Sequence, residues 1–527
     1  MAALQPRFET LIEMLQARAH LSPDQSAFRF DDRTVSYGQL WQAVNRFGSL
    51  LLELGVARQE PILLLLPNGS EFFVAFYGVQ RSGATAVPLF PGSGETRVLD
   101  MARHCRAKIV VVPSGEPLGE LSKNAKKHGI RLVTVAEDAG DLPPEFPRIK
   151  PEDHAFLQFT SGSTGEPKGV ILTHRNLLAN LEQLIGGMRI TPQDVFVSWL
   201  PCYHDMGLIL MTMLPFYLGA KLVLLPTSVL DVTRWLTSIE THRGTFTAAP
   251  DFAYRLCLRY TTRPQDYNLS SLRVALNAAE PVRLGTIESF ESIFGLENVM
   301  IAGYGLAEAS VGVSTGDPAS TPRVDERGFV SVGRPFAEID IQIVQDEHPV
   351  SAGQTGEIMV KSPANTQGYW LSPRASRALF WRGYVRTGDL GYQDEEGYLY
   401  IVGRKKSIIL RQGQNIAPHE IEACADSVTG IRYAAAVGID DGGLGGEQVY
   451  LFAELRPDID DTHFATTVHA VVNAIHRRMG FRPARVYLMK PGSIPLTHNS
   501  KLQHSRLKES YLDGSLRRNG ATLFPDY

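Results

Sequence analysis

Residues 156–172 read FLQFTSGSTGEPKGVIL, a polar, glycine-rich stretch between two short apolar runs. The flanking runs, 156–159 and 170–172, have the length and composition of buried β-strands, so we expect residues 160–169 to form the loop that joins them. Such a loop suits anion binding, because glycines let backbone N–H groups turn toward an anion while hydroxyls and a lysine add further donors. The polar donors are Thr160, Ser161, Ser163, Thr164 and Lys168, and the glycines are Gly162, Gly165 and Gly169.

The loop differs from a Walker P-loop, in which the lysine follows a glycine and precedes Ser or Thr at the start of a helix. Here Lys168 follows Pro167, precedes Gly169 and leads into a strand, and the next helix begins later, with Thr173 as its expected N-cap. Kinase and ATPase chemistry is therefore disfavoured. A plain hairpin turn is the alternative reading, but a turn needs neither four hydroxyls nor a lysine.

The length, composition and charge of the chain limit the classes of protein to which it can belong. A chain of 527 residues exceeds what one hydrophobic core usually supports, so we expect at least two domains. With 44% apolar and 20% charged residues the composition is that of a globular protein. The net charge of -4 argues against a nucleic-acid partner, which would require a concentrated basic surface.

The remaining composition favours residence in the cytoplasm. The four cysteines are scattered without metal-ligand spacing, as expected of buried thiols in a reducing compartment. The N-terminus carries Glu9 and Glu13 in an amphipathic pattern and has no signal-peptide core. The longest aliphatic run, 62–66, is too short to cross a bilayer, so no integral membrane contact is expected.

Helix-like and strand-like segments alternate through most of the chain, for example 37–54, 61–66 and 70–81, which predicts an α/β architecture with several sheets. The pattern of predicted elements changes near residue 404, where a basic triplet separates two short strands. We expect a large N-terminal domain over 1–403, a hinge at 404–407 and a small, mobile α/β C-terminal domain over 408–527. Pro418 is placed to start a helix, and the residues from 513 onward resemble a frayed tail.

Further motifs follow the glycine-rich stretch in a fixed order, and together they identify a family resemblance. They are LQFTSGSTGEPKGVILTHRNLLAN, SWLPCYHDMGLI, TAAPDFAYRLCLRY, RVALNAAEPVR, YGLAEA, RTGDLGY, GRKKSIILRQGQNIAPHEIE and PLTHNSKL. Over nearly its whole length the chain resembles the adenylate-forming superfamily of acyl-CoA synthetases, peptide adenylation domains and luciferases. Its similarity is greatest to the fatty acyl-AMP ligases and fatty acyl-CoA ligases.

The resemblance implies a two-step ligase reaction. A fatty acid carboxylate attacks the α-phosphate of ATP, giving an acyl-adenylate and pyrophosphate, and a pantetheine thiol of coenzyme A or an acyl carrier protein then displaces AMP. Both steps pass through additional negative charge, which positioned donors, a lysine and Mg²⁺ can stabilise. The expected ligands are therefore ATP, Mg²⁺, a fatty acid and a thiol carrier.

The resemblance also assigns roles to individual residues. Thr160, Ser161, Thr164 and Lys168 would hold the β- and γ-phosphates, with the rest of the loop (Gly162, Ser163 and Gly165) around them. The adenine would pack on Ala278, Ala279, Glu280 and Pro281 and stack on Tyr304, beside Gly305. Glu308 would contact Mg²⁺, with Thr164 as a second metal candidate, whereas an isolated glutamate here would read as helical surface. Asp389 would bind the ribose hydroxyls, Arg404 the ribose and phosphate, and Lys406 would be the hinge residue.

Two further residues are expected at the reacting carboxylate. Lys501, in PLTHNSK, resembles the catalytic lysine of adenylation, although Ser500 stands where the family usually has glycine. If that position needs positive φ, Ser500 would strain the loop and slow adenylation. His204 resembles a residue lining the acyl pocket. The apolar residues that follow would continue the lining of the acyl pocket or belong to the core; they are Leu208, Ile209, Met211 and Met213. Their composition favours a substrate acid with an apolar chain.

The acceptor and two alternative functions stay open. Fatty acyl-AMP ligases typically carry an extra segment between the YGLAEA and RTGDLGY motifs, and the stretch from Ala309 to Arg386 shows no surplus of sequence. We therefore expect that the insertion is absent, which weakens the assignment of a carrier protein and leaves coenzyme A open. A luciferase-like oxygenase shares the motifs, but no oxygen-activating feature is evident. A transferase that binds acyl-adenylate without forming it is supported only by Ser500.

Overall fold

The computed structural model describes residues 6–115, 119–136, 145–160, 167–227, 231–411, 414–440, 447–457, 459–496, 502–518 and 522–524. Its contacts divide the chain into two compact units. The first comprises residues 1–354, 358–387 and 393–400, and the second comprises 355–357, 388–392 and 401–527. The expected boundary at 403/404 lies three residues from the main division at 400/401.

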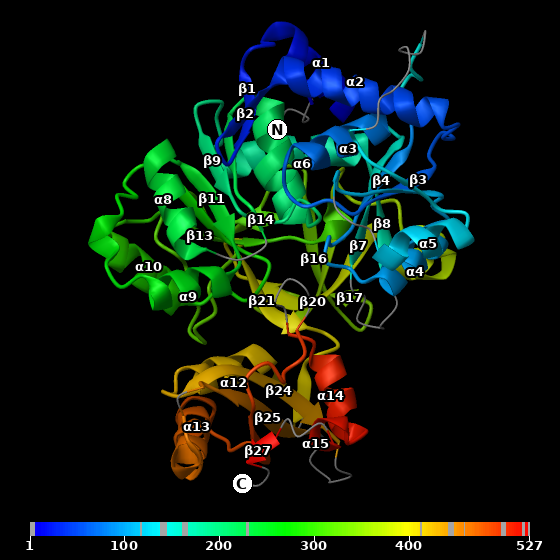
Figure 1. The fold of residues 1–527 in the computed structure, drawn as a ribbon. Helices are drawn as coiled ribbons and strands as arrows, with labels where there is room; N and C mark the ends of the chain where they lie inside the picture. Colours follow the sequence, from blue (N-terminus) through cyan, green and yellow to red (C-terminus); the bar gives the residue numbers. More distant parts are fainter. Residues whose placement is uncertain are drawn as a thin grey trace. The chain divides into compact units, whose positions relative to one another are not determined.

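Two sheets built largely from parallel strands form the frame of the first unit (Figure 1). One has the order β15 (Arg334–Pro335), β14 (Ser314–Thr315), β13 (Met300–Tyr304), β12 (Val274–Asn277), β11 (Phe246–Ala249), β9 (Val195–Ser198), β10 (Lys221–Leu224), β1 (Ser26–Phe30), β2 (Arg33–Ser36). The other has the order β6 (Arg131–Val133), β5 (Ile109–Val111), β3 (Pro61–Leu64), β4 (Thr85–Pro88), β7 (His154–Thr160), β8 (Lys168–Thr173). The α/β class with several sheets is thus confirmed.

Helices cover these sheets, as parallel strands require for the crossovers between them. They are α1 (Leu11–Leu21), α2 (Tyr37–Glu53), α3 (Ser70–Arg81), α4 (Glu95–Cys105), α5 (Gly119–Lys127), α6 (His174–Met188), α7 (Leu214–Leu218), α8 (Val232–His242), α9 (Asp251–Tyr260) and α10 (Leu284–Phe294). Helices α8, α9 and α10 gather on one side of the unit, beside β11 and β13 (Figure 1). Thr173 caps α6 as predicted, with its hydroxyl accepting from the backbone N–H of Asn176.

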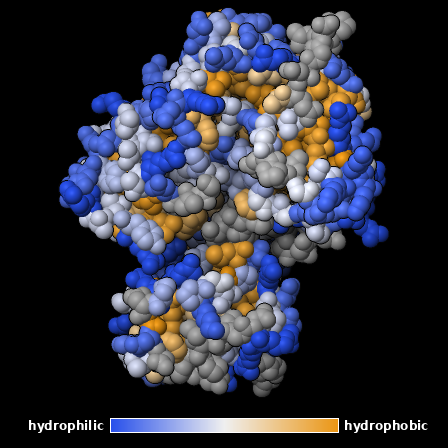
Figure 2. Space-filling view, viewed as in Figure 1, coloured by the Kyte–Doolittle hydropathy of each residue, from blue (hydrophilic) through white to orange (hydrophobic). Residues whose placement is uncertain are grey.

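Buried aromatic side chains form part of the core of the first unit. Phe28, Phe73 and Phe216 pack edge-on to one another or tilted, with ring centroids 4.8–6.3 Å apart, and Tyr37 and Tyr77 join them. Hydrophilic residues cover most of the visible rim of the unit, with apolar residues showing between them (Figure 2). All four cysteines are buried and free, as predicted.

A third sheet has the order β17 (His348–Pro349), β16 (Asp340–Gln345), β18 (Gly356–Lys361), β20 (Tyr384–Gln393), β19 (Phe380–Trp381), with β21 (Leu399–Arg404) also paired to β20. Helix α11 (Pro373–Leu379) precedes β19. Residues 309–386 are fully described and consist of short strands, α11 and turns.

The second unit is a small α/β body with its own core. Its sheet has the order β24 (Ile431–Ile439), β25 (Gln448–Leu455), β26 (Arg485–Met489), β27 (Thr522–Phe524), beside the ribbon of β22 (Ile409–Arg411) and β23 (Gln414–Ile416). Its helices are α12 (Pro418–Asp426), α13 (Phe464–Met479), α14 (His504–Leu512) and α15 (Ser515–Arg518). Pro418 starts α12 as predicted. The prediction of a frayed tail from residue 513 onward is wrong in part, because α15 forms and β27 pairs with β26.

A π-helix, η1 (Met206–Met213), follows the HDMG motif in the first unit. Leu208, Ile209, Met211 and Met213 on it are at most 1% exposed, which places them in the core. A wide π-turn of this kind brings Gly207 against the preceding chain: a Cβ built there would lie 2.2 Å from the carbonyl oxygen of Pro201. Gly186 on α6, in contrast, has open space around the position of a Cβ.

We expect Gly207→Ala to destabilise the protein by about 3 kcal/mol, because its methyl group collides with backbone that cannot move aside. The matched control, Gly186→Ala, should leave stability unchanged or raise it by about 0.5–1 kcal/mol through helix propensity. Thermal unfolding of both variants measures the difference. Equal midpoints for the two variants would contradict the close approach at Gly207.

Candidate functional site

The glycine-rich stretch lies between two paired strands. Strands β7 and β8 are antiparallel, and their register sets Thr160 opposite Lys168 and Phe159 opposite Gly169. The expected loop over 160–169 is therefore too long, because the backbone ladder continues through Thr160, Lys168 and Gly169. Five of the predicted phosphate ligands, Ser161, Gly162, Ser163, Thr164 and Gly165, lie outside the described residues.

Strand β8 lies at the edge of its sheet, and residues 366–370 cover that edge. The N–H of Trp370 donates to the carbonyl of Gly169 at 2.7 Å, and the N–H of Ile171 donates to the carbonyl of Gly368 at 3.0 Å. The hydroxyl of Thr366 donates to the carbonyl of Ile171 at 2.6 Å. These bonds fix residues 366–370 beside the strand that carries Lys168.

Tyr369 in this segment joins two of the predicted site residues. The Nζ of Lys168 lies 5.1 Å from the centroid of the Tyr369 ring, and the Tyr369 hydroxyl donates to Oε1 of Glu308 at 2.8 Å. Sequence reasoning missed Tyr369, because a tyrosine in GYW carries no pattern that separates a ligand from a core residue. Lys168 and Glu308, 140 positions apart in the sequence, are thus brought to the same place.

Glu308 itself lies on η3 (Ala307–Ala309), a 3₁₀ turn that follows β13. Its carbonyl accepts from the N–H of Thr366 at 2.8 Å, so the covering segment holds this turn as well as β8. Gly305 is required before the turn, since a Cβ there would lie 1.7 Å from the carbonyl oxygen of Val311. Tyr304, at the end of β13, is partly exposed beside it.

The predicted adenine loop follows β12. Ala278 is buried, and Ala279 has φ of 71°, a left-handed conformation that is uncommon for a residue with a side chain. Pro281 ends the loop on the surface. The Glu280 carboxylate turns to the start of α9, where it accepts from the N–H of Phe252. Burial, together with the nearby Asp251 carboxylate, raises the pKa of Glu280 to about 7.

The HDMG motif forms a local polar pair. Nδ1 of His204 lies 2.6 Å from Oδ1 of Asp205, and the same oxygen accepts from the N–H of Met206 at 2.7 Å, capping η1. The His204 side chain is partly exposed. The four apolar residues that follow are core, so the part of the expected acyl wall assigned to them is not open to a ligand in this structure.

Asp389 and Arg404 come together in the second unit. The buried Asp389 carboxylate pairs with Nε of Arg404 at 2.7 Å, while most of the Arg404 side chain stays exposed. The next residue, Lys405, pairs with the buried Glu357 at 2.9 Å, and its N–H donates to the carbonyl of Gly388. The backbone directly before Lys406 is therefore held at several points.

Lys501 and Ser500 lie outside the described residues, but both flanks of 497–501 are described. Leu496 and Leu502 form an antiparallel bridge, and the N–H of Gln503 donates to the carbonyl of Pro495 at 3.0 Å. Two buried carboxylates hold these flanks. Glu454 accepts from the N–H of Ile494 at 2.8 Å, and Glu422 binds Nε2 of His504 at 2.7 Å.

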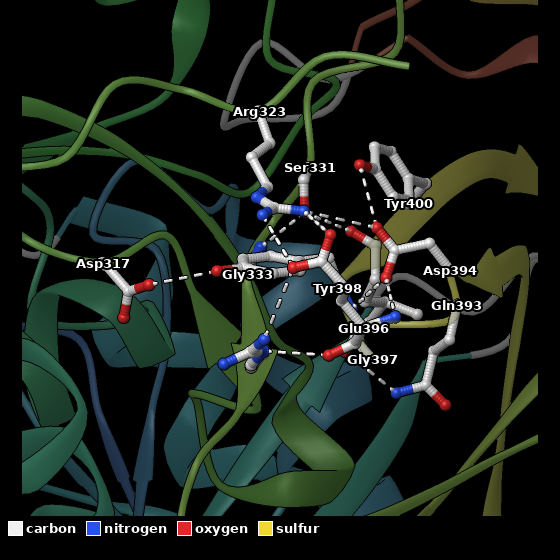
Figure 3. A network of polar contacts seen from close by, with 12 residues as sticks. Asp317, Arg323, Ser331, Gly333, Gln393, Asp394, Glu396, Gly397, Tyr398 and Tyr400 are labelled. Carbon is white, nitrogen blue, oxygen red and sulfur yellow. Dashed lines mark hydrogen bonds and ion pairs between the residues drawn. The ribbon is translucent and has the colours of Figure 1, made fainter. Parts of the chain in front are cut away.

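A cavity of about 230 Å³ lies elsewhere in the first unit, beside the first residues of β13 and the loop over 316–323. The network at its rim is drawn in Figure 3: the Arg323 guanidinium binds both carboxylate oxygens of Glu396 and stacks on the Tyr398 ring at 3.9 Å. Arg334 lies 4.4 Å from the same ring centroid. None of the predicted site residues lines this cavity.

Among the described residues, no group of three or more His, Cys, Asp or Glu side chains is placed to hold a metal ion by itself. Glu308 remains a suitable single ligand, because a carboxylate that accepts from Tyr369 at one oxygen can bind a hard cation with the other. Within the same part of the chain, no helix combines the length and apolar character needed to span a bilayer.

Comparison with known proteins shows similarity over nearly the whole chain. A family model described as AMP-binding enzyme matches residues 15–370. The medium-chain fatty acid–acyl carrier protein ligase JamA of Moorena producens is 30% identical, over 97% of this chain and 96% of its own length. A 4-hydroxyphenylalkanoate adenylyltransferase of Mycobacterium tuberculosis is 32% identical, over 97% and 93%. The JamA alignment runs over 583 positions against the 527 residues of this chain, so that relative contains segments that this chain lacks.

Solved structures are also similar to this chain over nearly its whole length. A structure from studies of fatty acyl-adenylate ligases of E. coli and L. pneumophila has a TM-score of 0.87 and 28% identity, covering 97% of this chain and 99% of the other. The o-succinylbenzoate coenzyme A synthetase of Bacillus subtilis, solved with ATP and magnesium, has a TM-score of 0.82 and 25% identity, covering 96% and 99%.

The raised pKa of Glu280 predicts a specific pH dependence of stability. Because the folded state holds the proton more tightly than the unfolded state, the ionised form opposes folding, and stability falls as pH rises from about 4.5 to about 7. Glu280→Gln keeps an acceptor for Phe252 without a charge, so it should stabilise the protein at pH 7.5 relative to pH 5 by about 1–3 kcal/mol.

Urea or thermal unfolding at the two pH values measures this effect. Glu288→Gln, an exposed glutamate on α10, is the matched control and should leave the difference between the two pH values as in the parent protein. A Glu280→Gln variant with the parental pH dependence would show that Glu280 is ionised without cost.

Proposed function

The chain belongs to the AMP-binding enzyme family, and from that membership we propose that it activates a fatty acid with ATP and passes the acyl group to a pantetheine thiol. The observation that carries the proposal is the grouping of Lys168, Tyr369 and Glu308 at the base of the glycine-rich hairpin. This grouping supports the proposal because it brings together one cation and one carboxylate, both partly exposed, and a metal-bound polyphosphate would require both.

In the first step a carboxylate oxygen of the acid bonds to the α-phosphorus of ATP. The bond from that phosphorus to the bridging oxygen breaks, and pyrophosphate leaves with the electron pair. Lys168 would bind the departing pyrophosphate from the strand side of the hairpin and offer its ammonium to the growing negative charge. Residues 160–165 would supply the remaining phosphate donors.

Mg²⁺, when bound, would neutralise phosphate charge and orient the leaving group. Glu308 fits as its protein ligand, because it is a hard oxygen donor held in one orientation by Tyr369. The o-succinylbenzoate coenzyme A synthetase was solved with ATP and magnesium, which supports the same ligands for this chain.

In the nucleotide, the ribose would bind Asp389 and the adenine would pack on Ala278–Pro281 and Tyr304. The ion pair with Arg404 orients the Asp389 carboxylate, whose ionised form can accept from two ribose hydroxyls. Lys501 would bind the substrate carboxylate and α-phosphate during adenylation. The carboxylates of Glu422 and Glu454, which hold both flanks of 497–501, support a defined position for that lysine.

In the second step the thiol sulfur bonds to the acyl carbon, the bond to the AMP oxygen breaks, and the thiol proton is released. The acceptor is coenzyme A or the phosphopantetheine arm of an acyl carrier protein, since the relatives include enzymes named for each. The names of the relatives also favour an acid with a long apolar part, namely a medium-chain fatty acid and a 4-hydroxyphenylalkanoate.

The test is exchange of labelled pyrophosphate into ATP in the presence of Mg²⁺ and a panel of acids. We expect exchange that depends on a fatty acid, and a loss of at least about 100-fold in Lys501→Ala, because adenylation loses the cation at the reacting phosphate. Lys490→Ala, an exposed lysine of the same unit, is the control and should exchange normally.

The acceptor is identified by adding coenzyme A or a pantetheinylated carrier protein and detecting the thioester by mass. Ordinary exchange in Lys501→Ala would remove the lysine from the mechanism. Absence of exchange with every acid, while externally supplied acyl-adenylate is still converted to thioester, would replace the proposal with a transferase that does not adenylate.

A further inference from the structure

The contacts of Tyr369 separate two opposite charges that would otherwise attract each other. Lys168 faces the ring and Glu308 accepts from the hydroxyl, so the two charged groups contact the same side chain at different places. Among the ion pairs of the described residues, none joins Lys168 to Glu308. A direct pair would consume both charges, because the ammonium and the carboxylate would each use the other in place of a ligand.

A tyrosine suits this position chemically. The ring attracts Lys168 through its π-face and uses none of the three ammonium N–H donors, which stay available for phosphate oxygens. The phenol is a neutral donor, so it orients the Glu308 carboxylate without cancelling its charge. An arginine or lysine at the same place would neutralise Glu308 and repel Lys168.

The position of Tyr369 is set by hydrogen bonds that involve neither the Lys168 ammonium nor the Glu308 carboxylate. Its N–H donates to Oγ of Ser376 at 2.9 Å, and Trp370 beside it donates through Nε1 to the carbonyl of Cys105 at 3.2 Å. Thr366 holds the same segment to the carbonyls of Glu308 and Ile171. The side chain therefore starts from a fixed point, the condition for organising a site before the ligand binds.

We propose that Tyr369 is a positioning residue which keeps Lys168 and Glu308 separate and oriented, so that the carboxylate serves the metal and the ammonium serves the pyrophosphate. The inference rests on the proposed function and adds a residue to it. Its two contacts have different consequences: the hydroxyl acts on the metal through Glu308, and the ring acts on the polyphosphate through Lys168.

Two substitutions separate these contacts. Tyr369→Phe removes the hydroxyl and keeps the ring, so binding of the metal should weaken by about 10-fold while pyrophosphate binding at saturating metal stays near normal. Tyr369→Leu removes both contacts and frees Lys168 to pair with Glu308, so metal and pyrophosphate binding should both weaken. Tyr398→Phe, which removes the hydroxyl of a tyrosine in the cavity network, is the control and should match the parent protein.

The measurement is equilibrium binding. Mn²⁺ is titrated with the full-length protein and an α,β-methylene analogue of ATP, with free Mn²⁺ followed by electron paramagnetic resonance, and pyrophosphate binding is measured by calorimetry. Pyrophosphate exchange at varied Mg²⁺ then shows whether excess metal relieves the defect of Tyr369→Phe. Excess metal would not relieve a defect that comes from loss of folding.

The outcomes separate the inference from the proposed function. Parental Mn²⁺ binding in Tyr369→Phe, or an equal loss of metal and pyrophosphate binding in both variants, would overturn the role of Tyr369. A parent protein that binds Mn²⁺ and the analogue but never exchanges pyrophosphate would refute the proposed function and leave the binding comparison intact.

Discussion

Backbone hydrogen bonds between strand β8 and residues 366–370 are the interaction on which the candidate site depends. An edge strand exposes a row of peptide groups that need partners, and here the partners come from a segment about 200 positions later in the chain. The same segment is bonded to the carbonyl of Glu308. One set of main-chain contacts thus fixes the strand of Lys168, the turn of Glu308 and the side chain of Tyr369 together.

In the second unit, buried carboxylates fix the two flanks of residues 497–501. Glu422 and Glu454 are at most 5% exposed, and each binds one basic side chain and one backbone N–H. Burial alone lowers the pKa of His504, but the facing Glu422 carboxylate raises it, and the net shift is upward. Removing one partner of such a pair would leave a buried charge without compensation, which makes these contacts strong constraints on the flanks of 497–501.

Local patterns predicted most elements well, because periodicity and capping act over a few residues. The helix Ser70–Arg81 covers the range that its apolar pattern predicts, and the helix Pro418–Asp426 begins at the predicted proline. The same reasoning failed at the tail, where β27 forms by pairing with β26 and not by its own propensity. It also ended the flanking strands too early, since the ladder of β7 and β8 extends to Thr160 and Lys168.

The sequence by itself determined the family, the α/β class and the identity of the residue types that a polyphosphate site requires, because each of these is written in contiguous motifs. Only the tertiary structure decided which of those residues meet. Lys168, Glu308 and Tyr369 are joined by strand pairing and a turn contact across about 200 residues, and such contacts depend on which peptide groups remain unsatisfied after each sheet has formed. No local pattern contains that information, and for this reason Tyr369 emerged only from the folded chain.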